Sequence, residues 1–282
     1  MQNNIVFVIV IYNKLIDDSI TIKTIKNIGL EINMIIVDNS DEQNQSIRRL
    51  NGEKCLAKKV QYINMGGNKG LSKAYNSAIE LCDGYDAIVL MDDDTEISKE
   101  YICELDRCLS IDKDIDIFAP IVYGQDGVIY SPNEFNFLRN KFMKDEFDFP
   151  SMDKFNAIAS CLAIRPCVFN DYRFNESLFV DQVDQNFFCD QRKRNVRFGI
   201  IPVTIRQNFY QRGSDLTSKK GWNRLKLRVA DIVRHARLLG GGFMFLAIVK
   251  SVGLGVQIGL KTKTPIIPIK TIYVLIKSIL KK

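Results

Sequence analysis

The chain has 282 residues, of which 46% are hydrophobic and 26% are charged, a composition that is typical of a globular protein and excludes a disordered or fibrous one. The charge is unevenly distributed, because residues 219–282 carry 14 Lys or Arg and one acid, Asp231, whereas residues 1–218 carry 25 basic and 32 acidic side chains. We therefore expect an acidic domain at 1–218 and a separate basic region at 219–282.

Cysteine usage and the N-terminus indicate the compartment. The seven cysteines are scattered, form no C-x-x-C pair and are odd in number, which argues against a disulfide framework and favours a reducing cytosol. The first apolar run, residues 5–12, lacks a basic segment before it and is too short for a signal peptide. We interpret it as a buried first strand.

Strands and helices alternate through the first half of the chain. Apolar runs predict strands at 5–12, 34–37, 60–63 and 87–91, and helical periodicity predicts helices at 17–28, 42–50 and 71–82 between them. This alternation is typical of an α/β fold with a mostly parallel sheet flanked by helices on both faces. Ligands of such sheets bind beyond the carboxyl ends of the strands.

The middle of the chain is less regular. Residues 118–149 place several phenylalanines between charges, which fits either a covering flap or a plain surface excursion. Beyond them the pattern predicts a strand at 157–164, a helix at 179–194 and a strand at 199–205.

Three consecutive carboxylates, Asp92 to Asp94, follow the strand at 87–91. Such a cluster is costly unless a positive charge faces it, and Mg²⁺ or Mn²⁺ prefers oxygen ligands of this kind. Because Asp92 and Asp94 are two residues apart, an extended backbone would aim both to one side, so we expect them to bind the metal. The alternative is that these acids only cap the helix that begins near Ser98.

The basic region predicts three helices, at 222–239, 243–260 and 266–282. Lys250 and Gln257 share one face of the second helix, as Lys270 and Lys277 share one face of the third. A polar stripe on an apolar helix favours a helix that lies in the plane of an anionic membrane surface. A membrane span, a core helix and an oligomer contact are the alternatives, and we expect no nucleic-acid partner because of the apolar stripe.

Five motifs, in this order and spacing, resemble family 2 glycosyltransferases of the GT-A fold. The similarity covers residues 4–215 and is greatest to the rhamnosyltransferase and galactofuranosyltransferase-like branch. The motifs are Val10-Ile11-Tyr12-Asn13, Ile36-Val37-Asp38-Asn39-Ser40, Gly66-Gly67-Asn68-Lys69-Gly70-Leu71 leading to Asn76, Asp92-Asp93-Asp94, and Phe179-Val180-Asp181-Gln182-Val183-Asp184.

The resemblance implies roles for individual residues. Asp38 would accept a hydrogen bond from a uracil or thymine base, unless it only forms a turn with Asn39 and Ser40. The glycine loop at 66–70 would turn its backbone N–H groups toward nucleotide phosphate or ribose. The full set implied to bind the nucleotide is Ile11, Tyr12, Asn13, Asp38, Asn68, Gly70, Lys73 and Asp93.

The same resemblance implies the chemistry. Asp92 and Asp94 would hold Mn²⁺ or Mg²⁺ against the donor diphosphate. Asp184 would be the general base that deprotonates the acceptor hydroxyl, giving inversion, with Asp181 as the second candidate and a solvated helix-terminal acid as the alternative. The expected partners are a nucleotide-sugar donor, a glycan or lipid-linked saccharide acceptor and an anionic membrane; a homo-oligomer stays open.

The sequence departs from the family pattern in two places. Val183, Asn186 and Asp190 replace the residues usual around the base. The histidine that often follows the last core strand is absent from residues 205–213, where Gln207 or Asn208 would assist the metal and Arg212 would contact diphosphate.

The function expected is an inverting glycosyltransferase that uses a UDP- or dTDP-sugar to build a capsule or O-antigen-like surface polysaccharide, peripheral to the inner face of the cell membrane. The departures keep open a catalytically inactive nucleotide-sugar-binding paralogue. A nucleotidyltransferase fits less well, because no basic glycine-rich loop follows the first strand.

Overall fold

The computed structural model describes residues 1–58, 60–207 and 217–281. Its centre is an eight-stranded sheet in which β6 (Ile129–Ser131) pairs with β5 outside the main order. The main order is β11 (Phe198–Arg206), β5 (Ile117–Tyr123), β10 (Leu162–Ile164), β4 (Ala87–Asp92), β1 (Ile5–Ile11), β2 (Asn33–Asp38) and β3 (Gln61–Asn64).

The sheet is mostly parallel, as predicted. β4, β1, β2 and β3 run parallel to one another and β11 runs parallel to β5, whereas β10 is antiparallel to both of its neighbours. β1 and β4 are apolar at successive positions because both of their faces are covered, which is why neither strand shows alternation of polar and apolar residues.

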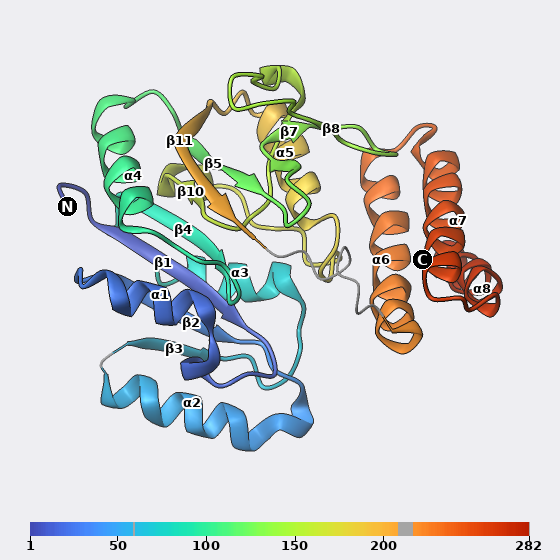
Figure 1. Ribbon diagram of the computed structural model, residues 1–282, viewed down its shortest axis with the longest axis horizontal. Coiled ribbons are helices and arrows are strands. Elements are labelled where there is room, and N and C mark those ends of the chain that lie inside the picture. The colour runs from blue at the N-terminus through green and yellow to red at the C-terminus, as the bar shows by residue number, and fades with distance from the viewer. Residues whose placement is uncertain (59, 208–216, 282) are drawn as a thin grey trace.

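Helices cover both faces of the sheet (Figure 1). Val6 and Val8 of β1 share a core with α3 (Leu71–Ile79) and α5 (Val183–Lys193). The alternate residues Phe7 and Ile9 share a core on the other face with α1 (Ile20–Ile28), α2 (Gln45–Ala57) and α4 (Lys99–Ile111). The prediction of an α/β fold with helices on both faces is therefore confirmed.

The middle of the chain differs from its prediction. It contains β5 and β6 of the central sheet, followed by a small antiparallel sheet of β8 (Lys141–Phe142), β7 (Asn133–Glu134) and β9 (Phe155–Asn156). The strand expected at 157–164 is wrong in length, because Cys161 has a positive φ of 61° and Leu162 donates a turn hydrogen bond to Ala159 O at 3.0 Å. Short 3₁₀ turns occur at Ile16–Asp18, Glu42–Asn44, Met152–Lys154 and Pro166–Phe169.

Three helices, α6 (Ser218–Leu239), α7 (Phe243–Lys261) and α8 (Ile266–Leu280), pack against one another at the C-terminal end. α6 lies between the sheet domain and the other two helices (Figure 1). In the described part of the chain, α7 is the one helix that is long and apolar enough to cross a membrane by length and composition.

Candidate functional site

A cavity of about 660 Å³ opens at the carboxyl ends of β1, β2 and β4, where the topology predicts a ligand site. Its walls also include the segment before α5 and one face of α6. Among the lining side chains are Tyr12, Asn39, Asn68, Gly70, Tyr75, Asp92, Asp93, Asp94, Ser160, Asp181, Asp184, Gln185, Gln207, Lys220, Asn223, Arg224 and Leu227.

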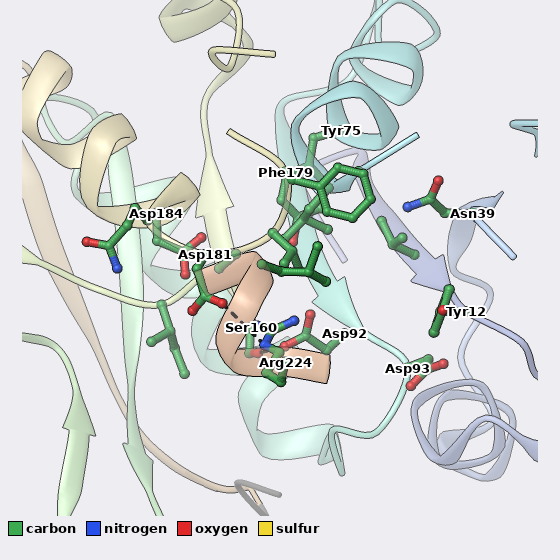
Figure 2. Close-up of a pocket in the computed structure, with 18 of the residues that line it drawn as sticks. Tyr12, Asn39, Tyr75, Asp92, Asp93, Ser160, Phe179, Asp181, Asp184 and Arg224 are labelled. Atoms are coloured by element: carbon green, nitrogen blue, oxygen red, sulfur yellow. Dashed lines mark hydrogen bonds and ion pairs between the residues drawn. The ribbon is translucent and has the colours of Figure 1, made fainter. Parts of the chain in front are cut away.

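The acidic triplet lies at the floor of this cavity. Asp92 accepts hydrogen bonds from Ser160 Oγ and from Gln207 Nε2, the latter at 3.2 Å. Asp93 forms an ion pair with Lys14, whose Nζ is 2.8 Å from Asp93 Oδ1. In the view of Figure 2, Asp92 lies between the side of the cavity that carries Asp184 and the side that carries Asp93.

The start of α1 holds the backbone of the triplet in place. Ile20 N donates to Asp93 O at 3.0 Å, and Thr21 Oγ1 donates to Asp92 O at 2.6 Å. The acids do not cap α4, because Ser98 occupies that position and accepts from Tyr101 N at 3.1 Å. The capping alternative for the triplet is therefore wrong.

The electrostatics of the triplet favour a bound cation. Displacement of water by the surrounding protein, and then the charges of Asp92 and Asp93, raise the pKa of Asp94 to about 6. The pKa of Asp93 is raised by burial, although Lys14 acts in the opposite direction. A divalent cation would oppose both effects by favouring the ionised carboxylates.

The residues present fit a hard cation that also binds substrate oxygens. Among residues 1–58, 60–207 and 217–281, no group of three or more His, Cys, Asp or Glu side chains is arranged to hold a metal. The available oxygen ligands are the carboxylates of Asp92 and Asp94 together with Gln207 Oε1, which is buried and accepts no hydrogen bond from the described residues. Mg²⁺ commonly combines one or two carboxylates with substrate phosphates in this way.

Asp184 lies in the first turn of α5 and faces the same cavity (Figure 2). Its Oδ1 is buried and accepts no hydrogen bond from the described residues. Burial, followed by the negative charge of Asp92, raises the pKa of Asp184 to about 7. A carboxylate with an unpaired oxygen and a pKa in this range is suited to accept a proton from a bound hydroxyl.

Asp181, the second candidate for the base, is already paired. Its carboxylate is 3.2 Å from Arg224 Nε and 3.7 Å from Arg228 Nε, both on α6. The pair with Arg224 is drawn in Figure 2. Because its carboxylate is engaged by these two guanidinium groups, Asp181 is less available than Asp184 to contact a bound acceptor hydroxyl.

Asp231 of α6 anchors the segment that precedes α5. Its carboxylate is fully buried and accepts hydrogen bonds from Phe179 N at 3.0 Å, Val180 N at 2.8 Å and Asp181 N at 2.9 Å. These bonds hold residues 179–181 out of the helix, which is why the helix predicted at 179–194 begins only at Val183. The sequence signal for this residue was its isolation as the one acid in a basic region.

The opposite side of the cavity carries part of the predicted nucleotide site. Tyr12 donates its hydroxyl to Asp41 at 2.9 Å, and Asn39 Nδ2 donates to Asn68 Oδ1 at 3.2 Å. These contacts connect the ends of β1 and β2 with the glycine loop. Tyr12, Asn68, Gly70 and Asp93 of the predicted set line the cavity, as does Asn39, which was part of a motif but was not selected.

Asp38 lies in a different environment. It is fully buried and accepts hydrogen bonds from Asn51 Nδ2 at 2.8 Å, Tyr62 OH at 2.9 Å and Ser40 N at 3.1 Å. The bond from Ser40 is the turn that was weighed as the alternative for this residue. Asp38 does not line the cavity, and its role toward a base stays a prediction.

The other three predicted nucleotide residues also lie outside the cavity lining. Ile11 is fully buried in the core, and Asn13 binds Ser40 Oγ and Asp41 beside the strand end. Lys73 is on the exposed side of α3, with its Nζ 3.9 Å from Glu176. The structure thus brings four of the eight predicted residues to the cavity wall.

The glycine loop differs from its expected role. The backbone amides of Lys69, Gly70 and Leu71 donate to Asn39 Oδ1, Asn68 Oδ1 and Phe179 O, at 2.8, 3.2 and 2.6 Å, so they are not turned toward a phosphate. Gly70 has a φ of 92°, and a Cβ there would lie 2.8 Å from Phe179 O. Glycine is needed because the start of α3 approaches the segment before α5 so closely.

Several lining residues had no sequence signal. Tyr75 and Ser160 reach the cavity from a helix and a loop, and Lys220, Asn223 and Arg224 belong to the basic region predicted at 219–282. Hydrophobic periodicity does not show which polar residues of an amphipathic helix face a cavity. The predicted contributions of Asn208 and Arg212 lie outside the described residues.

His235 is not in the cavity but in a core behind it. It is fully buried between the rings of Phe135 and Phe137, and its Nδ1 is 3.4 Å from Gln182 Oε1. Burial, and then the positive charge of Lys250, lowers the pKa of His235 to about 4.

Residues 6–173 match the model of the family described as Glycosyl transferase family 2. No curated protein matches the sequence significantly. The solved structure of GalNAc-T7 with UDP, GalNAc and Mn²⁺ superposes with a TM-score of 0.57 and 10% identity. The superposition covers 96% of this chain and 57% of the GalNAc-T7 chain. The S. aureus TarS structure of residues 1–349 gives a TM-score of 0.51 and 15% identity, with 98% and 89% of the two chains covered.

A further TarS structure, in complex with UDP-GlcNAc, gives a TM-score of 0.51 at 14% identity. At such low identities these similarities show the arrangement of the sheet and helices and no more. The finer branch expected from the sequence stays a prediction.

Proposed function

The chain belongs to glycosyl transferase family 2, and we propose that it transfers a sugar from a UDP- or dTDP-sugar donor to a glycan acceptor of a surface polysaccharide, with inversion. The observation that carries this proposal is one cavity in which the acidic triplet faces Asp184, a carboxylate with a buried oxygen that accepts no hydrogen bond from the described residues. A metal site for the diphosphate leaving group and a base for the acceptor are the two elements that a single displacement needs.

Each group has one role in the proposed reaction. Asp184 accepts the proton of the acceptor hydroxyl while that oxygen attacks the anomeric carbon from the face opposite the diphosphate. Asp92 and Asp94 would hold Mn²⁺ or Mg²⁺, which when bound would stabilise negative charge on the departing diphosphate. The use of Mn²⁺ is supported by the structure of GalNAc-T7 with UDP, GalNAc and Mn²⁺.

The donor nucleotide is proposed to bind between the β1 and β2 ends and the glycine loop. Tyr12, Asn39 and Asn68 present a phenol ring and amide groups on that wall. Such groups hydrogen-bond and stack on a base or ribose. A UDP-sugar donor is supported by the structure of TarS in complex with UDP-GlcNAc.

The acceptor is proposed to enter along α6, where Lys220, Asn223 and Arg224 line the cavity opposite the sheet. Amide and cationic groups at a cavity wall suit a saccharide that carries a phosphate linkage. A lipid-linked saccharide handled in the cytoplasm at the inner face of the cell membrane has these properties.

The first test is calorimetric binding of UDP, TDP, GDP and CMP to the purified protein, each with and without Mn²⁺. We expect UDP or TDP to bind more tightly than the other two and to require Mn²⁺. The nucleotide that binds then selects the sugar donors for a transfer assay. Equal, metal-independent binding of all four, or no binding, would contradict the proposed donor site.

A second candidate is a nucleotide-sugar-binding paralogue without turnover, favoured because residues 205–213 lack the histidine that the family often has after the last core strand, where Gln207 lines the cavity instead. Its expected behaviour is metal-dependent UDP or TDP binding with no transfer and no slow hydrolysis of any UDP- or dTDP-sugar. Replacement of Gln207 by His gives the comparison, because activity that appears only in the variant would favour the inactive paralogue.

A further inference from the structure

We infer that α7 and α8 form a docking surface for an anionic lipid bilayer, on which both helices lie in the plane of the membrane. The outward face of α7 carries large apolar side chains, among which Phe245 is 69% and Leu260 is 75% exposed. Its inward face carries a row of small residues at every fourth position, Ala247, Ser251, Gly255 and Gly259. A helix of a water-soluble bundle normally has the opposite arrangement, with its large apolar residues inside.

The small row of α7 brings α8 close. A Cβ at Gly255 would lie 2.6 Å from Thr271 Oγ1, and one at Gly259 would lie 2.9 Å from Pro268 Cδ. Close packing through small residues is typical of helices whose outer surfaces contact lipid, because apolar burial between the helices contributes little there. The exposed apolar side chains of α7 and those of α8 therefore lie on either side of the close contact between the two helices.

The outward face of α8 continues the apolar surface and adds charge. Ile269, Tyr273 and Leu280 are 64%, 69% and 76% exposed. Lys277 lies on the exposed side next to this apolar row, and Lys270, one heptad earlier, is also exposed, with its Nζ 5.8 Å from the ring centroid of Trp222 on α6. A row of lysines beside a row of large apolar residues is typical of helices that lie at the lipid interface.

Charge favours lipid over a second copy of the chain as the occupant. Residues 243–282 contain seven lysines and no acid. A symmetric contact between two copies would place these like charges together, whereas anionic headgroups supply the opposite charge, with about 1 kcal/mol of attraction for each lysine near the surface. Lys250 does not belong to this face, since its Nζ donates to Phe137 O at 2.6 Å and attaches α7 to the sheet domain.

The position of α6 connects this surface to the cavity. α6 packs on α7 and α8, and Arg224 and Leu227 on its other side line the cavity. The cavity therefore lies about one helix diameter, roughly 10 Å, from the docking helices. A lipid-linked acceptor could reach it from the bilayer, and this consequence alone rests on the proposed function.

The test is flotation of the full-length protein with vesicles of phosphatidylcholine alone and with vesicles that also contain phosphatidylglycerol. We expect flotation only with the anionic vesicles and release at high salt. Lys277→Glu and the double substitution of Tyr273 and Ile276 by Ser should each weaken partitioning by about tenfold or more. Lys113→Glu and Leu56→Ser, which change exposed residues of the sheet domain, are the matched controls and should leave it unchanged.

Three kinds of result would overturn the inference. The first concerns flotation itself, either its absence with anionic vesicles or wild-type flotation of both docking variants. Another is a lipid-free dimer, measured by light scattering, that the Tyr273 and Ile276 substitutions dissociate, since this would make a second copy the occupant. The third is vesicle binding that resists both salt and alkaline extraction, as a spanning α7 would. None of these measurements depends on nucleotide binding or transfer.

Discussion

At the scale of single residues, the aspartates of the cavity differ in whether their carboxylate oxygens have a hydrogen-bond or ion-pair partner. Asp92 accepts hydrogen bonds from Ser160 and Gln207, and Asp181 forms an ion pair with Arg224. Asp184 Oδ1 is buried without one among the described residues, and its pKa is raised to about 7 by burial and by Asp92. A buried oxygen that lacks a partner has a free-energy cost that a substrate hydroxyl can remove. The proposed base is thus distinguished by its environment as well as by its place in a motif.

Asp184→Asn should abolish transfer while donor binding persists. The amide has nearly the same shape but cannot accept the hydroxyl proton, so we expect the transfer rate to fall by about 10²-fold or more. The dissociation constant for UDP with Mn²⁺ should change by no more than a few-fold. Asp181→Asn is the comparison variant, and it should lose less activity because Arg224 already pairs with that carboxylate. Normal turnover by the Asp184 variant would remove this residue from the mechanism.

At the scale of elements, the structure is organised by contacts between segments that are distant in sequence. The segment at 179–181 receives its conformation from Asp231 of α6, about 50 residues later. α7 packs closely on α8 because Gly255, which has no side chain, lies directly against Thr271. The contribution of each of these two contacts to stability can be measured with a pair of substitutions. One substitution removes or disturbs the contact, and the other changes a nearby residue of the same helix but leaves the contact in place.

Asp231→Asn should destabilise the protein and lower activity together. The carboxylate accepts three backbone N–H bonds in a fully buried position, and an amide can accept fewer. We expect a loss of about 2 kcal/mol in the free energy of unfolding, measured by urea titration. Arg234→Met removes only the partly exposed ion pair to Asp231 and should cost less than about 1 kcal/mol. If Arg234→Met lowered the free energy of unfolding as much as Asp231→Asn, the ion pair and not the three backbone hydrogen bonds would account for the stabilisation.

Two glycines of α7 should respond in opposite directions to alanine. Gly255→Ala places a methyl group 2.6 Å from Thr271 Oγ1 and should destabilise the protein by about 1–3 kcal/mol. Gly253→Ala meets no atom within 4 Å and should stabilise it by up to about 1 kcal/mol, because alanine has the higher helix propensity. Chemical denaturation of both variants measures the difference. Equal effects would show that α7 and α8 do not approach as closely as described.

At the scale of the whole molecule, the parts predictable from sequence were those with a local signal. Apolar runs located β1, β2, β3 and β4, and the parallel sheet placed Asp92, Asn68 and Tyr12 at one edge. The contribution of α6 to the cavity could not be predicted, because it depends on how a helix 22 residues long docks on a distant loop. The start of α5 was predicted too early because it also depends on a distant contact. Asp231 of α6 binds the backbone N–H groups of residues 179–181 and keeps them out of the helix.

The core that joins α6 and α7 to the sheet domain should make global stability pH-dependent. His235 has a normal pKa near 6.5, which burial and the charges of Lys250, Lys193 and Arg192 lower to about 4. The unfolded chain therefore binds one more proton than the folded chain between these values, so stability is complete above pH 6.5 and is lost as the pH falls toward 4. The full effect is about 3 kcal/mol.

The measurement is the free energy of unfolding from urea titrations between pH 7.5 and pH 4.5, in the wild type and in His235→Phe. The variant keeps an aromatic ring between Phe135 and Phe137 but has no proton to bind. Carboxylates contribute to the slope in both proteins, among them Asp94 and Asp184, whose raised pKa values act in the opposite direction. Only the difference between the two curves reports on His235, and it should grow as the pH falls below 6.5. Parallel curves would mean that His235 has the same pKa in the folded and the unfolded protein. Burial in the core between α6, α7 and the sheet domain would then not hinder its protonation, which would contradict the prediction.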